Sequence, residues 1–201
     1  MKIFKIRDHL SRFRVGIAGA GGLGSNCAVS LARSGIGTLV ISDFDVVEPG
    51  NLNRQYFFIN QLGLFKTTAL KETIARINPD TIVIAHTLRL HRENIPEIFA
   101  GCDAIVEAFD SDEMKEMLAE TIQIKMPEIP VIIGSGLAGW GNNESIKCRK
   151  IDDTLFVCGD ETTETTPDNP ALAPRVSIVA NMQADKVIEI LMNKNPEIRK
   201  K

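Results

Sequence analysis

The sequence predicts an α/β fold: a mostly parallel sheet with helices on both faces and an antiparallel C-terminal extension. Three observations lead to this prediction. Short apolar runs alternate with amphipathic stretches along most of the chain. A glycine-rich turn, GAGGLG at residues 19–24, follows the first apolar run. Beyond Gly141, short alternating segments follow one another without a helix between them, which favours antiparallel pairing.

The elements of the first half follow from the spacing of apolar residues. Short apolar runs predict strands at VGIAG (15–19), TLVISD (38–43) and TIVIA (81–85). Amphipathic spacing predicts helices over residues 25–33 and 66–77. The second of these helices is expected to end at Asn78, because Pro79 cannot continue it.

The second half continues the alternation and then changes character. Helices are expected near residues 93–99 and over 112–125, and strands at AIVEAF (104–109) and PVIIGS (130–135). SIKC (145–148) and TLFVC (154–158) predict the antiparallel extension. A last helix is expected to begin at Pro174, a residue favoured at a first helical position. It carries one apolar stripe, formed by Val176, Val179, Ala180, Val187, Ile190 and Leu191.

Length and composition predict one compact unit. The chain has 201 residues, of which 44% are hydrophobic and 24% charged, so we expect residues 1–201 to form a single domain. A formal net charge of −3 gives no overall attraction to nucleic acid or to anionic lipid. The first thirty residues carry several charges and no apolar run of signal-peptide length, which predicts a cytoplasmic protein without a membrane partner.

The cysteines indicate neither disulfides nor a metal centre. Cys27, Cys102, Cys148 and Cys158 include no C-x-x-C pair, and the histidines lie elsewhere in the sequence. We therefore expect free thiols and no structural zinc.

The glycine turn predicts a nucleotide-binding site of Rossmann-like type. Gly19, Gly21 and Gly24 satisfy G-x-G-x-x-G between a strand and a helix, where a tight turn brings backbone amides close to phosphate. Asp43 ends the next strand, where a ribose hydroxyl would find an acceptor. A tight turn without any ligand is the alternative interpretation of the glycines.

Two cations and a carboxylate predict more than cofactor binding. Arg54 and Lys66 follow Asp43 in the sequence, and bringing a carboxylate to a triphosphate requires such cations to converge. Asp110 follows an expected strand at the sheet edge where open α/β folds bind ligands. Because magnesium takes one or two carboxylates plus waters and phosphates, Asp110 is the candidate metal ligand. Asp112 is better explained as the start of the next helix.

These segments together resemble a known superfamily. GAGGLGS (19–25), DFD (43–45), NLNRQ (51–55), Lys66 and Asp110 are similar to the ThiF/MoeB/ubiquitin-activating superfamily, whose members adenylate the C-terminal glycine of ubiquitin-like proteins. The resemblance extends from about Val15 to the last helix. Together with the short chain, AGAGGLGSN, DFDVVEPGNLNRQ and LAPRV are most similar to compact ThiF-like proteins of thiamine biosynthesis.

The resemblance implies a role for each matching residue. Asp43 would bind the ribose of ATP, Asn51, Arg54 and Lys66 would contact its phosphates with support from Gln55, and Asp110 would serve Mg²⁺. The implied nucleotide-binding set is Gly19, Gly21, Gly22, Gly24, Asp43, Asp45, Asn51, Arg54, Gln55 and Lys66. Arg54, Lys66 and Asp110 are the candidate catalytic residues. A homodimer and a small sulfur-carrier protein ending in Gly-Gly are the implied partners, the carrier being adenylated before thiocarboxylate formation in thiamine biosynthesis.

The sequence departs from the family pattern in two respects. Many members carry two C-x-x-C pairs for zinc, which are missing here. Many also carry an upstream arginine motif that reaches the partner subunit, and the arginines before Val15 do not match it. Cys158 is either a semi-buried thiol at a strand end or a residue that relays sulfur. Six acidic residues between 151 and 174, without a lysine or arginine, indicate either a solvated loop or a site that recruits a basic carrier tail.

Other functions remain open at the level of sequence. An adenylating dehydratase acting on a modified tRNA base would use the same ATP site, although the chain shows no basic stripe for tRNA. An NAD-dependent oxidoreductase would need a further region for its substrate, for which 201 residues leave little room. A nucleotide sensor without activity would have no need to keep Arg54, Lys66 and Asp110 together.

Overall fold

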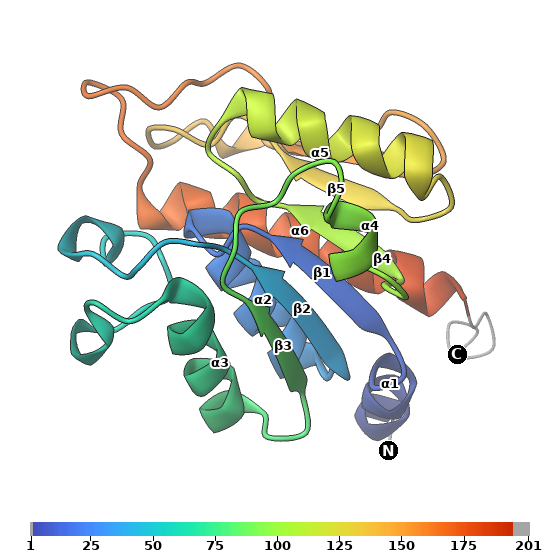
Figure 1. Cartoon of the computed structure of the whole chain (residues 1–201). Coiled ribbons are helices and arrows are strands. Elements are labelled where there is room, and N and C mark those ends of the chain that lie inside the picture. Colours follow the sequence, from blue (N-terminus) through green and yellow to red (C-terminus); the bar gives the residue numbers. More distant parts are fainter. Residues whose placement is uncertain (1, 195–201) are drawn as a thin grey trace.

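A computed structural model describes residues 2–194 of the chain (Figure 1). Its centre is a seven-stranded sheet with the order β3-β2-β1-β4-β5-β7-β6. The strands are β1 (Arg14–Ala18), β2 (Thr38–Ser42), β3 (Ile82–His86), β4 (Ala104–Glu107), β5 (Val131–Gly134), β6 (Lys147–Lys150) and β7 (Leu155–Gly159). The α-helices are α1 (Lys2–Leu10), α2 (Gly22–Ser34), α3 (Lys66–Ile77), α4 (Ile95–Ile98), α5 (Asp112–Lys125) and α6 (Ala173–Asn193).

The predicted fold class is confirmed. Strands β1 to β5 pair in parallel, as the alternation of strands and helices predicts. The C-terminal extension is a hairpin in which β6 runs antiparallel to β7. One detail differs from the sequence prediction, because β7 itself continues the sheet in parallel, with Val131 opposite Leu155. The extension therefore reverses the direction of the sheet at β6 alone among the described strands.

Helices cover both faces of the sheet, and each face has its own apolar core. Alternate residues of β1 point to opposite faces, so that Val15 and Ile17 join the cluster under α2, α3 and α6. Ala18, from the same strand, joins the cluster under α4 and α5, where Phe99 is fully buried. The central strands β1, β2, β4 and β5 are buried on both faces, which explains why they appear in the sequence as continuous apolar runs rather than alternating ones.

Helix α6 ties the central strands together. Gln183 is completely buried within it, and its Nε2 donates to the carbonyl oxygens of Glu107 in β4, at 2.8 Å, and Ile132 in β5, at 3.0 Å. The predicted apolar stripe of this helix faces the core at Val176, Val179, Ala180, Val187 and Leu191. This packing holds the neighbouring ends of β4 and β5, which carry loops of the site described below.

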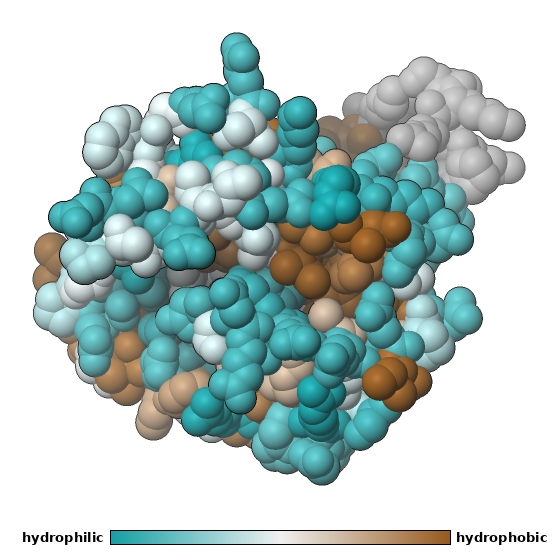
Figure 2. All heavy atoms as spheres, turned by 90° about the horizontal axis from the view of Figure 1, so that it is seen from above, coloured by the Kyte–Doolittle hydropathy of each residue, from teal (hydrophilic) through white to brown (hydrophobic). Residues whose placement is uncertain are grey.

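Within residues 2–194 no helix is both long and apolar enough to cross a bilayer. The face of the molecule seen in Figure 2 is mostly hydrophilic, with hydrophobic side chains gathered mainly right of centre.

Candidate active site

One large cavity lies where the parallel strands end. It has a volume of about 710 Å³ and is lined by the loops that follow β1, β2, β3, β4, β5 and β7. The strand order reverses between β1 and β4, because β2 and β3 lie on one side of β1 while β4 and β5 lie on the other. Open α/β sheets bind ligands in the crevice outside such a reversal. The fold therefore places the cavity where a nucleotide is expected.

The glycine turn lines the cavity, and its conformation requires residues that have no Cβ. Gly19 has a φ of +97°, a conformation that residues with a Cβ rarely adopt. A Cβ on Gly24 would lie 1.9 Å from the carbonyl oxygen of Gly19. Helix α2 begins at Gly22, so its first backbone amides face the cavity, as the predicted phosphate site requires.

Replacing Gly24 with alanine is expected to disrupt the turn. The new Cβ meets backbone rather than a flexible side chain, and overpacking of this kind costs about 1–3 kcal/mol. Affinity for ATP, measured by isothermal titration calorimetry, should fall by roughly tenfold or more. Gly50→Ala is the matched control, since no atom lies within 4 Å of its added Cβ. Equal affinities in the two variants would contradict the role given to the turn.

Asp43 is held at the end of β2 by backbone donors. Its Oδ2 accepts from the amide of Ala20 at 2.7 Å, and its Oδ1 accepts from the amide of Asp45 at 2.8 Å. Burial raises the pKa of Asp43 above its ordinary value, and these hydrogen bonds oppose that effect in part. The carboxylate lines the cavity beside the glycine turn, so a ribose hydroxyl could reach its remaining lone pairs.

Lys66 is a buried cation that forms an ion pair with a neighbouring carboxylate. It opens helix α3, its side chain is 8% exposed, and its Nζ lies 2.7 Å from Oδ2 of Asp45. Both residues line the cavity. Asp45 is half exposed and keeps the ammonium paired, which a buried charge requires. An entering phosphate would find a charged donor already in place.

Arg54 lies on the loop that packs over the start of α2. Asn26 of α2 donates from Nδ2 to the carbonyl oxygen of Arg54 at 2.9 Å, which fixes the loop against the glycine turn. The guanidinium of Arg54 donates to Gly50 O at 3.1 Å and to Asn53 Oδ1 at 2.8 Å, and Arg54 lines the cavity. It therefore stands beside the predicted phosphate site with further N–H donors for an anion.

Two of the three side-chain amides of the NLNRQ segment, Gln55 and Asn51, were assigned to the site and are placed differently. Gln55 lines the cavity, is 92% buried, and its Oε1 has no partner among the described residues. Asn51 does not line the cavity; its Oδ1 accepts from the amide of Glu48 at 2.9 Å and closes the short helix Pro49–Asn51. The structure thus gives Asn51 a role in shaping the loop.

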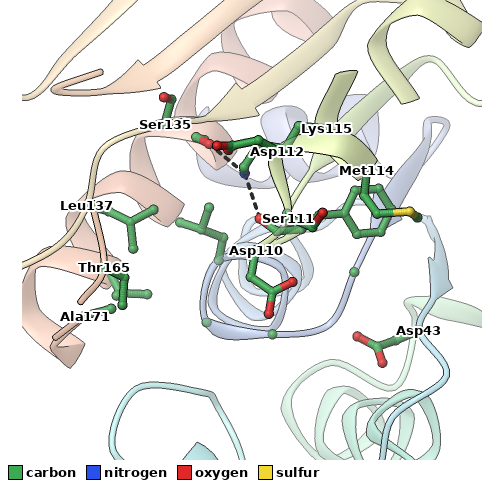
Figure 3. Close-up of a pocket in the computed structure, with 18 of the residues that line it drawn as sticks. Asp43, Asp110, Ser111, Asp112, Met114, Lys115, Ser135, Leu137, Thr165 and Ala171 are labelled. Atoms are coloured by element: carbon green, nitrogen blue, oxygen red, sulfur yellow. Dashed lines mark hydrogen bonds between the residues drawn. The ribbon is translucent and has the colours of Figure 1, made fainter. Parts of the chain in front are cut away.

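Asp110 stands in the middle of the cavity. Figure 3 shows it between Asp43 on one side and Leu137, Thr165 and Ala171 on the other. It follows β4, is exposed, and faces the space above the glycine turn. Among the described residues no group of three or more His, Cys, Asp or Glu side chains could hold a metal ion by itself. A single carboxylate with the phosphates of a nucleotide is still a set that suits Mg²⁺.

Glu107 forms a structural ion pair with Lys115. It is completely buried, and Nζ of Lys115 lies 3.1 Å from its Oε2. The same ammonium donates to the carbonyl oxygens of Phe109, at 2.7 Å, and Gly134, at 2.9 Å (Figure 3 shows Lys115 above Asp110). Burial raises the pKa of Glu107 above its ordinary value, and the charge of Lys115 opposes that rise. Lys115 thereby fixes the ends of β4 and β5 together.

The far wall of the cavity contains residues that sequence reasoning did not assign to the site. Ser135, Gly136 and Leu137 follow β5, and the segment 161–165 follows β7. This segment is part of the acidic stretch 151–174 noted above, and the residue before it, Asp160, is a buried carboxylate rather than a solvated one. The sequence signal that could have indicated this wall is Arg175, a charged residue inside the otherwise apolar start of α6.

None of the four cysteines lines the cavity. All four are free, and Cys158 is completely buried in β7 opposite Cys148 of β6. Burial raises the pKa of the Cys158 thiol far above its ordinary value. A nucleophilic cysteine requires a lowered pKa and access to its partner, so this arrangement supports the reading of Cys158 as a packed thiol.

The fold and the cavity together define a class of protein, an α/β nucleotide-binding domain that gathers Arg54, Lys66 and a central carboxylate at its strand ends. Comparison with protein families then identifies the chain. Residues 4–201 match the model of the ThiF family, and the chain belongs to that family.

Curated relatives are adenylyltransferases and modifier-activating enzymes. The molybdopterin-synthase adenylyltransferase of Salmonella typhimurium is 26% identical over 94% of this chain and 76% of its own length. The adenylyltransferase and sulfurtransferase MOCS3 of Dictyostelium discoideum is 31% identical over 88% of this chain and 42% of its own. Ubiquitin-like modifier-activating enzyme 5 of Arabidopsis thaliana is 42% identical over 41% of this chain and 19% of its own length. The chain thus covers a part of most of these relatives.

Solved structures share the fold. The tRNA N6-threonylcarbamoyladenosine dehydratase TcdA of E. coli, in complex with ATP, superposes with a TM-score of 0.86 at 21% identity, covering 96% of this chain and 91% of that one. The protein PaaA superposes with a TM-score of 0.69 at 28% identity, covering 94% of this chain and 58% of that one.

Proposed function

We propose that this protein adenylates the C-terminal glycine carboxylate of a small ubiquitin-like sulfur-carrier protein, using ATP, and so activates the carrier for thiocarboxylate formation in thiamine biosynthesis. Residues 1–201 act in this proposal as one adenylyltransferase domain, working as a homodimer. The observation that carries it is the cavity, in which Arg54 and Lys66 lie beside the glycine turn while Asp110 lies in the middle. Membership of the ThiF family and the adenylyltransferases among the relatives support it.

The reaction brings two anions together, and the cations of the cavity reduce the repulsion between them. An oxygen of the glycine carboxylate attacks the α-phosphorus of ATP; the new O–P bond forms as the bond to the bridging oxygen breaks, and pyrophosphate leaves with that electron pair. Arg54 and Lys66 stabilise the phosphate charge, because a unit cation at about 4 Å contributes on the order of 4 kcal/mol at an effective dielectric near 20. Asp43 holds the ribose and the glycine turn holds the phosphates.

Mg²⁺ has a place in this proposal at Asp110. When bound there, the ion would neutralise part of the charge on the phosphate oxygens. The lone carboxylate fits this purpose, because magnesium commonly combines one or two protein carboxylates with substrate phosphates and water. Glu107, which lies nearby, is already paired with Lys115 and is left out of the metal site.

Exchange of labelled pyrophosphate into ATP tests the proposed function. We expect exchange that depends on a carrier ending in Gly-Gly and disappears when the carrier's last glycine is removed. The pool of carriers should include the small ubiquitin-like proteins encoded by the same organism. Exchange with no carrier, or with none of them, would overturn the proposal, and a thermal shift with NAD but not ATP would favour an oxidoreductase instead.

A second candidate is an adenylating dehydratase that acts on a modified tRNA base. The superposition on TcdA favours it, because that fold covers nearly the whole chain. The net charge of −3 argues against a tRNA substrate. Release of AMP from ATP on addition of tRNA carrying a threonylcarbamoyl base, without any carrier protein, would identify this activity.

A further inference from the structure

Two loops form the wall of the cavity that faces Asp43 in Figure 3. One follows β5 and contributes Ser135, Gly136 and Leu137; the other follows β7 and contributes residues 161–165. None of the residues proposed to contact the nucleotide lies on this wall. In the proposed reaction the nucleotide occupies the glycine-turn side, so the wall is the side on which the second substrate enters.

Arg175 connects both loops to helix α6. It lies in the first turn of that helix, its side chain is 4% exposed, and it forms an ion pair with Asp160 at the start of the β7–α6 loop. Its Nη1 donates to the carbonyl oxygen of Gly141 in the β5–β6 loop. A single guanidinium therefore holds two loops that are far apart in the sequence.

Asp160 extends this connection into the wall. Its side chain is 2% exposed, and its Oδ1 accepts from the amides of Thr162, at 2.9 Å, and Thr163, at 2.8 Å. Burial alone would raise the pKa of Asp160, but these amides, the Thr163 hydroxyl and Arg175 together hold it well below its ordinary value. The carboxylate therefore stays charged and fixes the chain direction of the segment that lines the cavity.

The two loops also touch each other directly. Backbone amides of Asp160 and Glu161 donate to the carbonyl oxygens of Gly136, at 3.0 Å, and Ser135, at 3.1 Å. Gly136 has a φ of +73°, and a Cβ there would lie 2.1 Å from Oδ1 of Asp160. The approach is therefore close enough to require glycine, and the wall behaves as one unit.

We propose that Asp160 and Arg175 are a positioning pair, which holds segment 161–165 in place so that the incoming carboxylate substrate is oriented against the nucleotide. This inference rests on the proposed function and adds residues to it that contact neither ATP nor the reacting atoms. Removing one member of a buried ion pair leaves the other charge without compensation, so the wall should shift. A misplacement of about 1 Å at a reacting site can cost on the order of a hundredfold in rate.

Steady-state kinetics of pyrophosphate exchange separate this role from a general loss of structure. Arg175→Met should raise the KM for the carrier by about tenfold or more, while the KM for ATP changes by less than about twofold. Asp160→Asn should act in the same direction, and the double variant should be no worse than Arg175→Met, because the two residues act as a pair. Arg175→Lys, which keeps the charge, should restore part of the loss.

The matched control is Arg149→Met. Arg149 forms an ion pair with Glu161 on the same loop, but its side chain is 56% exposed, and exposed pairs contribute little. This variant should keep both KM values. A parallel rise of the two KM values in Arg175→Met, or carrier kinetics unchanged from the wild type, would overturn the proposal.

Amide hydrogen exchange gives a readout that does not depend on activity. In the wild type, the amides of residues 160–163 should exchange slowly, and Arg175→Met should speed their exchange by about tenfold or more while the strands β1 and β2 stay protected. Unchanged protection would refute the role of the pair even if the protein adenylates a carrier. Conversely, faster amide exchange in Arg175→Met, together with a wild-type protein that adenylates no carrier, would leave the wall correctly described and refute the proposed function alone.

Discussion

Replacing either Arg54 or Lys66 with alanine is expected to lower carrier-dependent pyrophosphate exchange by about 10²–10³-fold, the usual effect of removing one preorganised group that stabilises developing charge. Arg54 lines the cavity beside the glycine turn and has further N–H donors for an anion, and Lys66 is buried and paired with Asp45. Each variant removes a cation that lines the cavity. Initial rates of exchange at saturating ATP give the measurement.

The controls for these variants are Arg76→Ala and Lys71→Ala. Both residues are exposed on α3 and lie outside the cavity, so both variants should exchange pyrophosphate at the wild-type rate. Circular dichroism should show an unchanged fold in all four proteins. Near-normal exchange in Arg54→Ala or Lys66→Ala would refute the catalytic assignment of that residue.

Replacing Lys115 with methionine is expected to cost about 3–5 kcal/mol in the free energy of unfolding, because it leaves the carboxylate of Glu107 buried and unpaired. The loss should also depend on pH. Burial raises the pKa of Glu107 in the folded state, and loss of the Lys115 charge raises it further. A group with a raised folded-state pKa favours the folded state at low pH, and that contribution is lost as the pH rises through the folded pKa.

Urea unfolding at pH 5 and pH 8 measures this effect. Lys115→Met should be less destabilised at pH 5 than at pH 8, because Glu107 can be neutral in the folded protein at the lower pH. Lys125→Met, on the exposed end of the same helix, should stay within about 0.5 kcal/mol of the wild type at both values. A loss that is equal at the two pH values would mean that the charge of Glu107 is not its cause.

Apolar spacing predicted most of the fold because the buried strands and amphipathic helices each leave a local signal. Helix α1 was not predicted, since its apolar residues do not share one buried face: Leu10 is buried, while Ile3 and Phe4 are 59% and 74% exposed. The direction of β7 could not be predicted either, because strand pairing between β5 and β7 depends on contacts between residues more than twenty positions apart.

The site shows the same division between local and distant information. The glycine turn, Asp43 and Arg54 belong to short motifs whose spacing is visible in the sequence, and the structure brings them to one cavity. Lys115 and Arg175 were missed because each also connects to a separate segment of the chain: Lys115 contacts a carbonyl group 19 residues away, and Arg175 contacts one 34 residues away. Asn51 lies within the motif but closes a turn, a distinction that requires coordinates.

The convergence of cations on the triphosphate is tested most directly by a crystal structure with an ATP analogue that carries a methylene group between its α- and β-phosphorus atoms. We expect the guanidinium of Arg54 and the ammonium of Lys66 to contact phosphate oxygens, with Asp43 on the ribose and a divalent ion between Asp110 and the phosphates. A nucleotide seated in the cavity with both cations still turned to their present partners, Asn53 and Asp45, would contradict the proposed chemistry.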